Sequence, residues 1–246
     1  MKPVTAFGIA IGFFGILATS VQVGFAKPTA LLAQSQPYAP AIDPTNFAAK
    51  IDNPYFPLTP GTTMIFEGKT DAGFERTEAQ VSSETKIIMG VKCVSVVDTV
   101  TIDGKIEELT TDWYAQDKQG NVWYFGEDSK AYKDGKVIST KGSWLGGVKG
   151  AYPGYIMKAK PNVGETYRQE YFKGEAEDMA TLVSLNEPVT VPQGSYKNVW
   201  MTKEWSALEN PPIIEYKYYA KGIGQIMTTG GTGKGWKLSL IEIKNK

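Results

Sequence analysis

Short runs of alternating apolar and polar residues, each followed by a turn, repeat along most of this chain beyond residue 60. The runs are rich in Val, Ile, Thr, Tyr and Trp, the residue types that suit a pleated, half-buried strand. Helical potential is confined to residues 175–182, a short segment. Strands at such regular spacing predict an all-β fold with little helix, in which a single curled antiparallel sheet forms a half-barrel or a barrel.

The clearest pair of predicted strands flanks the turn at residues 117–121. Residues 108–114 and 122–125 are rich in aromatic and β-branched side chains, and the sequence between them is Asp-Lys-Gln-Gly-Asn. Gly120 can adopt the positive φ that a tight turn needs, and Asp and Asn side chains can bond the local backbone. The pattern therefore predicts a β-hairpin.

Strand alternation then predicts which side chains of this hairpin share a face. Asp112 and Tyr114 fall on one face of the first strand, whereas in the second strand Trp123 falls with Glu127 and opposite Tyr124. Carboxylates and aromatic rings are thus mixed on single faces. This mixture predicts a partly solvated cavity lined by one face, and the alternative is a solvent-exposed face with the rings packed below it.

The same mixture of charged and aromatic residues recurs at residues 167–178, 203–205 and 215–219. A concave pocket lined by rings and paired charges would bind an amphiphile or a sugar. Cross-strand ion pairs on a solvated face are the simpler explanation. The candidate ligand-binding residues are Asp112, Trp113, Tyr114, Trp123, Tyr124, Glu127, Arg168, Glu170, Tyr171, Glu177, Glu204, Trp205, Tyr216 and Lys217.

Residues 142–160 interrupt the strand pattern. They combine five glycines and a proline with large apolar side chains. This composition predicts a long functional loop or flap in preference to a regular element.

The first 33 residues have the composition of an export signal. Lys2 precedes an apolar run, and small residues follow it, with cleavage predicted after Ala26 or Ala33. An uncleaved anchor, which would keep the protein near a membrane, is the alternative. We therefore predict a signal peptide at 1–33, a proline-rich arm at 34–60, a β domain at 61–246, and an exported protein in the periplasm or outside the cell.

Composition removes several classes of chemistry. The chain has no histidine, which excludes Ser-His-Asp and Cys-His catalysis and histidine-bound metals. Its 26 basic and 26 acidic residues balance without a basic stripe, so nucleic acid is not predicted as a partner. We predict neither a cofactor nor a metal site. The catalytic groups that remain are carboxylates, Lys, Tyr and Ser.

Four segments carry a resemblance to known proteins: NPYFPLTPGTTMIFEG (53–68), DWYAQDKQGNVWYFGED (112–128), VTVPQGSYKNV (189–199) and EYKYYAKGIGQIM (215–227). They resemble a group of uncharacterised exported bacterial proteins. More distantly they are similar to curved-sheet proteins of the LolA and LolB lipoprotein-carrier type and of the DUF3108 or TapB-like group. The resemblance implies a half-barrel with an apolar or amphipathic concave side, and it transfers no catalytic residue.

These observations lead to one main functional prediction and two alternatives. The main prediction is a non-enzymatic, exported protein that binds an amphiphilic or lipid-like small molecule in an aromatic and charged concave cleft. The first alternative is a histidine-free hydrolase, for example a glycosidase, with an acid and base pair drawn from Asp112, Glu127, Glu170 and Glu177. The second is a partner-binding module with exposed aromatic patches.

Overall fold

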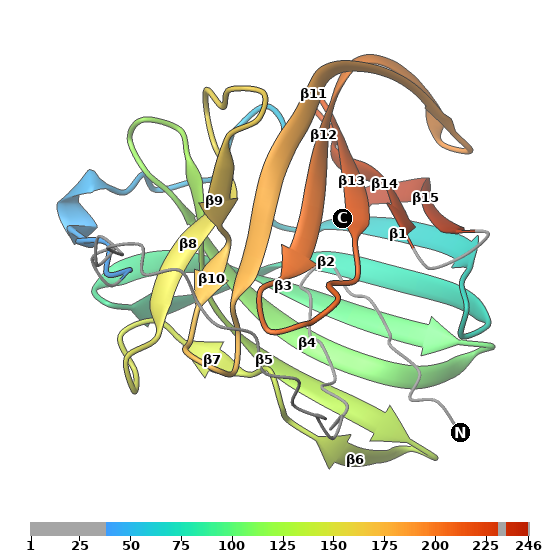
Figure 1. Cartoon of the computed structure of the whole chain (residues 1–246), viewed down its shortest axis with the longest axis horizontal. Coiled ribbons are helices and arrows are strands. Elements are labelled where there is room, and N and C mark those ends of the chain that lie inside the picture. The colour runs from blue at the N-terminus through green and yellow to red at the C-terminus, as the bar shows by residue number, and fades with distance from the viewer. Residues whose placement is uncertain (1–37, 231–234, 246) are drawn as a thin grey trace, which may run out of the picture.

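The computed structural model describes residues 38–230 and 235–245. It shows one antiparallel sheet that is nearly closed into a barrel, which confirms the predicted fold class (Figure 1). The described residues contain no α-helix, and their one helical turn is the 3₁₀ helix η1 (Pro44–Asn46). The predicted signal peptide lies outside the described residues.

In the described part of the chain, fifteen strands make up the sheet. In chain order they are β1 (Thr62–Lys69), β2 (Phe74–Ile88), β3 (Val91–Ile102), β4 (Lys105–Gln116), β5 (Val122–Lys133), β6 (Lys136–Ser139), β7 (Trp144–Leu145), β8 (Tyr152–Met157), β9 (Thr166–Arg168), β10 (Glu170–Tyr171), β11 (Asp178–Val191), β12 (Gly194–Ser206), β13 (Glu215–Ala220), β14 (Gly224–Gly230) and β15 (Trp236–Asn245).

The strand order explains how the sheet closes on itself. It runs β10-β8-β5-β4-β3-β2-β1-β15-β14-β13-β12-β11-β9, with β6 and β7 also paired with β5. In Figure 1 the strands β2–β5 cross β11–β13 at a steep angle, so the inner faces of the two halves lie opposite each other. The two ends of the order, β10 and β9, are separated in sequence by Gln169 alone. We call residues 168–170 the seam of the barrel.

The predicted hairpin at residues 117–121 is present as the β4–β5 connection. Gly120 has a φ of 90°, in the left-handed region that the turn requires. The Asp117 carboxylate accepts hydrogen bonds from the backbone N–H of Asn121 at 2.9 Å and from the Trp123 indole N–H at 2.9 Å. Asp117 therefore holds both the backbone of the turn and the indole ring of Trp123 in place.

A β-bulge in β5 interrupts strict alternation. The register passes from the pair Trp113–Gly126 to the pair Tyr114–Tyr124, which leaves one extra residue on β5. Gly126 has a φ of 145°, and a Cβ at this position would lie 2.5 Å from the carbonyl oxygen of Trp144. Glycine is therefore required both by the backbone conformation and by the approach of β7.

The bulge changes which side chains of β5 face the barrel interior. Asp112 and Tyr114 share the inner face, as predicted, and their partners across the ladder are Glu127 and Tyr124. The prediction that Glu127 lies on the face of Trp123 is wrong, because the extra residue at the bulge reverses the alternation between them. Trp123 faces outward.

Two other local predictions are wrong. The predicted flap at residues 142–160 contains β7 and β8, and both strands pair with β5. Gly154 lets β8 pass close to the seam, since a Cβ there would lie 2.5 Å from the carbonyl oxygen of Arg168. Residues 175–182 are not helical, because β11 begins at Asp178 and its pairing with β12 outweighs local propensity.

Apolar side chains form two cores, one on each side of the sheet. Inside the barrel, Phe56, Phe66, Tyr114 and Tyr219 belong to a large cluster that fills one end of the interior. Outside β3, β4 and β5, a smaller cluster contains Cys93, Trp113, Trp123, Phe125 and, packed against it, Phe47.

The segment before β1 connects these two cores. Phe47 packs outside the sheet, whereas Phe56 packs inside it. Between them, the Gln116 side-chain oxygen accepts hydrogen bonds from the backbone N–H groups of Asp52 at 2.9 Å and Asn53 at 2.7 Å. The segment therefore covers the apolar end of the barrel. None of the helical structure within residues 38–230 and 235–245 is long and apolar enough to cross a membrane.

Candidate functional site

The inner face of the barrel away from the apolar end carries an unusual number of acidic side chains. Nine of the described carboxylates are buried there, and among the described residues Lys217 is the one buried cation. We call these ten side chains the acidic chamber. The carboxylates are Glu75, Asp98, Glu108, Asp112 and Glu127 from β2–β5, and Glu170, Asp178, Glu204 and Glu215 from β10–β13.

Strand pairing brings several of these carboxylates face to face. Asp112 pairs with Glu127 across β4 and β5, and Glu204 pairs with Glu215 across β12 and β13. Directly opposed residues have Cβ atoms about 5 Å apart, and like charges at such positions repel. Some of these carboxyls must therefore be protonated, unless positive charge is added to the chamber.

Lys217 supplies positive charge on the β11–β13 side. Its Nζ lies 3.1 Å from Oε2 of Glu204, and 3% of its side chain is exposed. Burial lowers the pKa of Lys217, but the charges of Glu204 and Glu215 more than offset this effect, so the pKa is raised. Oε1 of the same Glu204 accepts hydrogen bonds from the hydroxyls of Thr202 at 2.6 Å and Tyr219 at 3.3 Å.

Hydroxyl groups hold the carboxylates of the opposite side. The Thr110 hydroxyl lies 2.8 Å from Oε1 of Glu108 and 3.1 Å from the Ser129 hydroxyl, and the Tyr124 hydroxyl donates to Oδ1 of Asp112 at 2.6 Å. These bonds orient individual oxygens but bring no positive charge. On the β2–β5 side of the chamber, the charge of Lys217 acts on Asp112 only as a minor effect, so these hydroxyl contacts orient the carboxyls without neutralising them.

Burial shifts the titration of the chamber toward neutral pH. It raises the pKa of Glu75 and of Glu108 to about 7, against an opposing effect of hydrogen bonds from neighbouring threonines. It also raises the pKa of Asp178 and of Glu215 to about 8. These four groups therefore exchange protons in a pH range where ordinary carboxylates are fully ionised.

Three further carboxylates are shifted by burial and by one another. Burial raises the pKa of Asp112, Glu127 and Glu170 well above the usual range. The next contribution comes from Asp98 for Asp112, from Glu170 for Glu127, and from Asp178 for Glu170. The ionisation of each carboxyl thus affects the pKa of the next, from one half of the barrel to the other.

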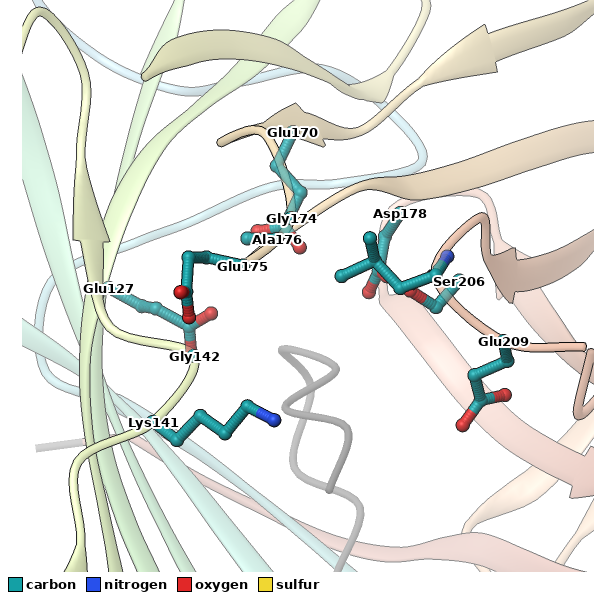
Figure 2. Close-up of a pocket in the computed structure, with 11 residues that line it drawn as sticks. Glu127, Lys141, Gly142, Glu170, Gly174, Glu175, Ala176, Asp178, Ser206 and Glu209 are labelled. Carbon is teal, nitrogen blue, oxygen red and sulfur yellow. The ribbon is translucent and has the colours of Figure 1, made fainter. Parts of the chain in front are cut away.

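A pocket of about 230 Å³ opens into the chamber next to the seam (Figure 2). Glu127 is 3% exposed, and within the described part of the chain neither of its carboxylate oxygens has a hydrogen-bond partner. An unpartnered, buried carboxylate at a pocket wall is costly unless something else compensates it. The lining residues include Glu127, Glu170, Asp178 and Ser206, with Lys141, Glu175 and Glu209 nearer the solvent.

The structure divides the predicted site residues into those that face the chamber or the apolar end of the interior and those that do not. The inward-facing residues are Asp112, Tyr114, Tyr124, Glu127, Glu170, Glu204 and Lys217. Trp113 and Trp123 belong instead to the outer cluster. Trp205 and Tyr216 alternate with inward-facing residues of β12 and β13 and lie on the outer face.

The remaining predicted residues, Arg168, Tyr171 and Glu177, meet at the seam. Arg168 Nη1 lies 3.4 Å from Oε2 of Glu177, and the Arg168 guanidinium lies 4.6 Å from the centre of the Tyr171 ring. Strict alternation in one strand would place Arg168 and Glu170 on the same face, but the chain passes from β9 to β10 between them. Glu170 lines the pocket, whereas Arg168 is partly exposed.

Sequence reasoning left out five chamber residues: Glu75, Asp98, Glu108, Asp178 and Glu215. Two of them carried a signal, since alternation places Glu108 with Asp112 and Glu215 with Lys217. Glu75 and Asp98 lie in segments that resemble ordinary solvent-facing strands, and Asp178 lies in the segment with predicted helical potential. Within the described residues, no group of three or more His, Cys, Asp or Glu has an arrangement that could hold a metal ion.

Comparison with known proteins finds similar structures but no named family. No protein-family model and no curated protein matches this chain. One similar structure is a protein from Bacteroides fragilis with a YmcC-like fold that is inferred to be exported; it is 17% identical, with a TM-score of 0.46 over 78% of this chain and 99% of its own.

A second similar structure comes from Parabacteroides distasonis and is inferred to be a lipoprotein. It is 13% identical, with a TM-score of 0.41 over 77% of this chain and 98% of its own. The resemblance to the LolA, LolB and TapB-like proteins stays a prediction.

Proposed function

We propose that this protein is an exported binding protein whose acidic chamber takes a small molecule with at least one positively charged amine. Glu127 carries the argument, because both its oxygens are buried at the pocket wall without a partner among the described residues. A bound ammonium group would supply three donors and one positive charge at this point. The predicted export signal supports the location.

Charge balance also favours a cation. Glu170 and Asp178 line the same pocket as Glu127, and within the described residues Lys217 is the single buried cation of the chamber. A ligand that ends in an anion would add repulsion to carboxylates that already repel one another. A bound cation would replace protons held by the carboxyls of the chamber.

Available space supports an amine over an acyl chain. The pocket of about 230 Å³ has room for several water molecules or a short aliphatic amine. The apolar space beside Phe56 and Tyr114 measures about 30 Å³, which is close to the volume of one water molecule. The lipid-like ligand predicted from sequence would have to displace core side chains, whereas a small amphiphile with a cationic head would not.

Calorimetric titration of the full chain with 1,4-diaminobutane at pH 8, compared with 1,4-butanediol, tests this proposal. We expect the diamine to bind and the neutral diol not to bind. The isosteric Glu127→Gln substitution should weaken diamine binding at least about tenfold, because it removes one buried charge from the contact. The exposed Glu84→Gln serves as the matched control. Equal binding of diamine and diol, or no effect of Glu127→Gln, would reject the proposal.

Glycoside hydrolysis is a second candidate, favoured by one observation. Glu127 and Glu170 line one pocket, and each has a raised pKa, as a general acid requires. Nitrophenyl glycosides provide a direct assay. Turnover that disappears in both Glu127→Gln and Glu170→Gln, with folding intact, would favour the enzyme, and turnover retained in both would remove this pair from consideration.

A further inference from the structure

A second concave surface lies on the outside of the barrel, opposite in charge to the chamber. It is an open groove of about 970 Å³ over β1, β15, β14, β13 and β12. Its outward-facing residues include Lys69, Lys237, Thr229, Tyr216 and Lys203. We call this surface the lysine groove.

Strand register arranges the groove as a single row. Lys69 pairs with Lys237, Lys237 with Thr229, Thr229 with Tyr216, and Tyr216 with Lys203. Because paired residues share a face, these five side chains all project from the outer surface in one line across the strands. The positions of these side chains in the row are therefore set by strand pairing and not by a loop.

Among the described residues, the lysines of this row have no acidic partner. Within residues 38–230 and 235–245, none of Lys69, Lys203 and Lys237 takes part in an ion pair, although Lys203 lies 5.6 Å from the centre of the Trp205 ring. Lys69 and Lys237 are directly opposed, an arrangement that repels. Asp71 is the one carboxylate among the described residues that line the groove, so positive charge prevails there.

The spacing of the lysines indicates the size of the ligand. Neighbouring strands lie about 4.8 Å apart, so Lys237 and Lys203 are separated by three strand spacings, or about 14 Å. A single phosphate or sulfate ion cannot contact both ends. The ligand must be a chain with negative charges along its length.

The groups between the lysines indicate the chemistry of that chain. Tyr216 and Thr229 separate Lys203 from Lys237, so Tyr216 is the aromatic ring of the row. An aromatic ring offers a flat apolar face and, in tyrosine, a polar edge, which suits a sugar ring. From the register and the charge, we propose that the lysine groove binds an acidic polysaccharide chain.

Fluorescence anisotropy with a labelled oligogalacturonate, a chain of uronic acids, tests the lysine groove in the full-length protein. We expect saturable binding that weakens as salt is added, with neutral dextran failing to compete. Combined Lys69→Gln, Lys203→Gln and Lys237→Gln should reduce affinity about tenfold, from three exposed charge contacts. The control is a triple variant with Lys→Gln at three exposed lysines outside the groove, Lys92, Lys105 and Lys136. It removes the same total charge and should leave the affinity unchanged.

The aromatic part of the proposal has its own test. Tyr216→Leu should weaken oligogalacturonate binding, and Tyr216→Phe, which keeps the ring, should restore it. Competition by inorganic polyphosphate as strong as competition by unlabelled oligogalacturonate would overturn the sugar preference. Equal losses in the groove and control lysine variants would overturn the site itself. Because Glu127→Gln changes the chamber and not this surface, it should bind the labelled chain normally, so the two proposals can fail separately.

Discussion

The buried carboxylates make the stability of this protein depend on pH in an unusual direction. Glu75 and Glu108 have pKa values raised to about 7, and Asp178 and Glu215 have values raised to about 8. Unfolded carboxyl groups titrate near pH 4. Between about pH 5 and pH 7 the folded protein therefore holds protons that the unfolded chain has lost, and stability must fall as pH rises.

The expected size of this effect follows from a single group. A carboxyl that stays protonated in the folded state and ionises in the unfolded state lowers the free energy of unfolding by about 1.4 kcal/mol per pH unit. One such group lowers it by about 3 kcal/mol between pH 5 and pH 7. Carboxylates with lowered pKa values, such as Glu165, act in the opposite direction only below about pH 5.

Urea unfolding followed by tryptophan fluorescence, at pH 5, 6, 7 and 8 and constant ionic strength, measures this dependence. We expect the midpoint to decrease steadily with pH while the m-value stays constant. The double substitution Glu75→Gln and Glu108→Gln should flatten the dependence, and the exposed Glu84→Gln should not. A midpoint that is constant or rises between pH 5 and pH 7 would refute the assignment of protonated, buried carboxyls.

Two other predictions concern single positions. Lys217→Met should lower the free energy of unfolding by roughly 3–5 kcal/mol at pH 8, because it leaves the Glu204 carboxylate buried without its cation. Urea unfolding should show a smaller loss at pH 5. Equal losses at the two pH values would contradict this account. Gly126→Ala should cost at least about 1–3 kcal/mol, because the bulge needs a φ of 145° and close approach to the Trp144 carbonyl. Thermal unfolding measures this cost. Gly104→Ala is the control, because Gly104 also has a positive φ, of 78°, but a Cβ there would meet no described atom within 4 Å.

The fold class could be predicted from sequence because alternation and turn residues are local signals. Residues 117–121 carry their own turn chemistry, and the hairpin formed where it was expected. Residues 77–82 and 86–88 are two strand-like runs in the sequence, but both are parts of β2, joined across an irregularity between Val81 and Thr85. A local pattern predicts the strands, but it does not show which of them are continuous.

The site could be predicted only in part, because its defining property is burial of charge. Asp98 and Glu75 look like solvent-facing positions in alternating strands, and only closure of the barrel turns that face inward. Glu127 was assigned to the wrong face because of the bulge, although the isolated Gly126 within a strand pattern was a usable signal. The proximity of Glu170 to Glu127 depends on the seam, which joins strands from opposite edges of the sheet.

Pairing of β1 with β15 has a consequence for how the chain reaches its folded state. Thr62 and Asn245 lie 183 residues apart in sequence, yet their side chains are hydrogen-bonded at 3.2 Å. Contacts of such long range are slow to form, because a long loop must close before any pairing stabilises it. Until the last strand has been synthesised, β1 is an unpaired edge that can pair with another copy of the chain. Pairing of β1 with β15 therefore follows the synthesis of β15, and it is the step that removes this edge.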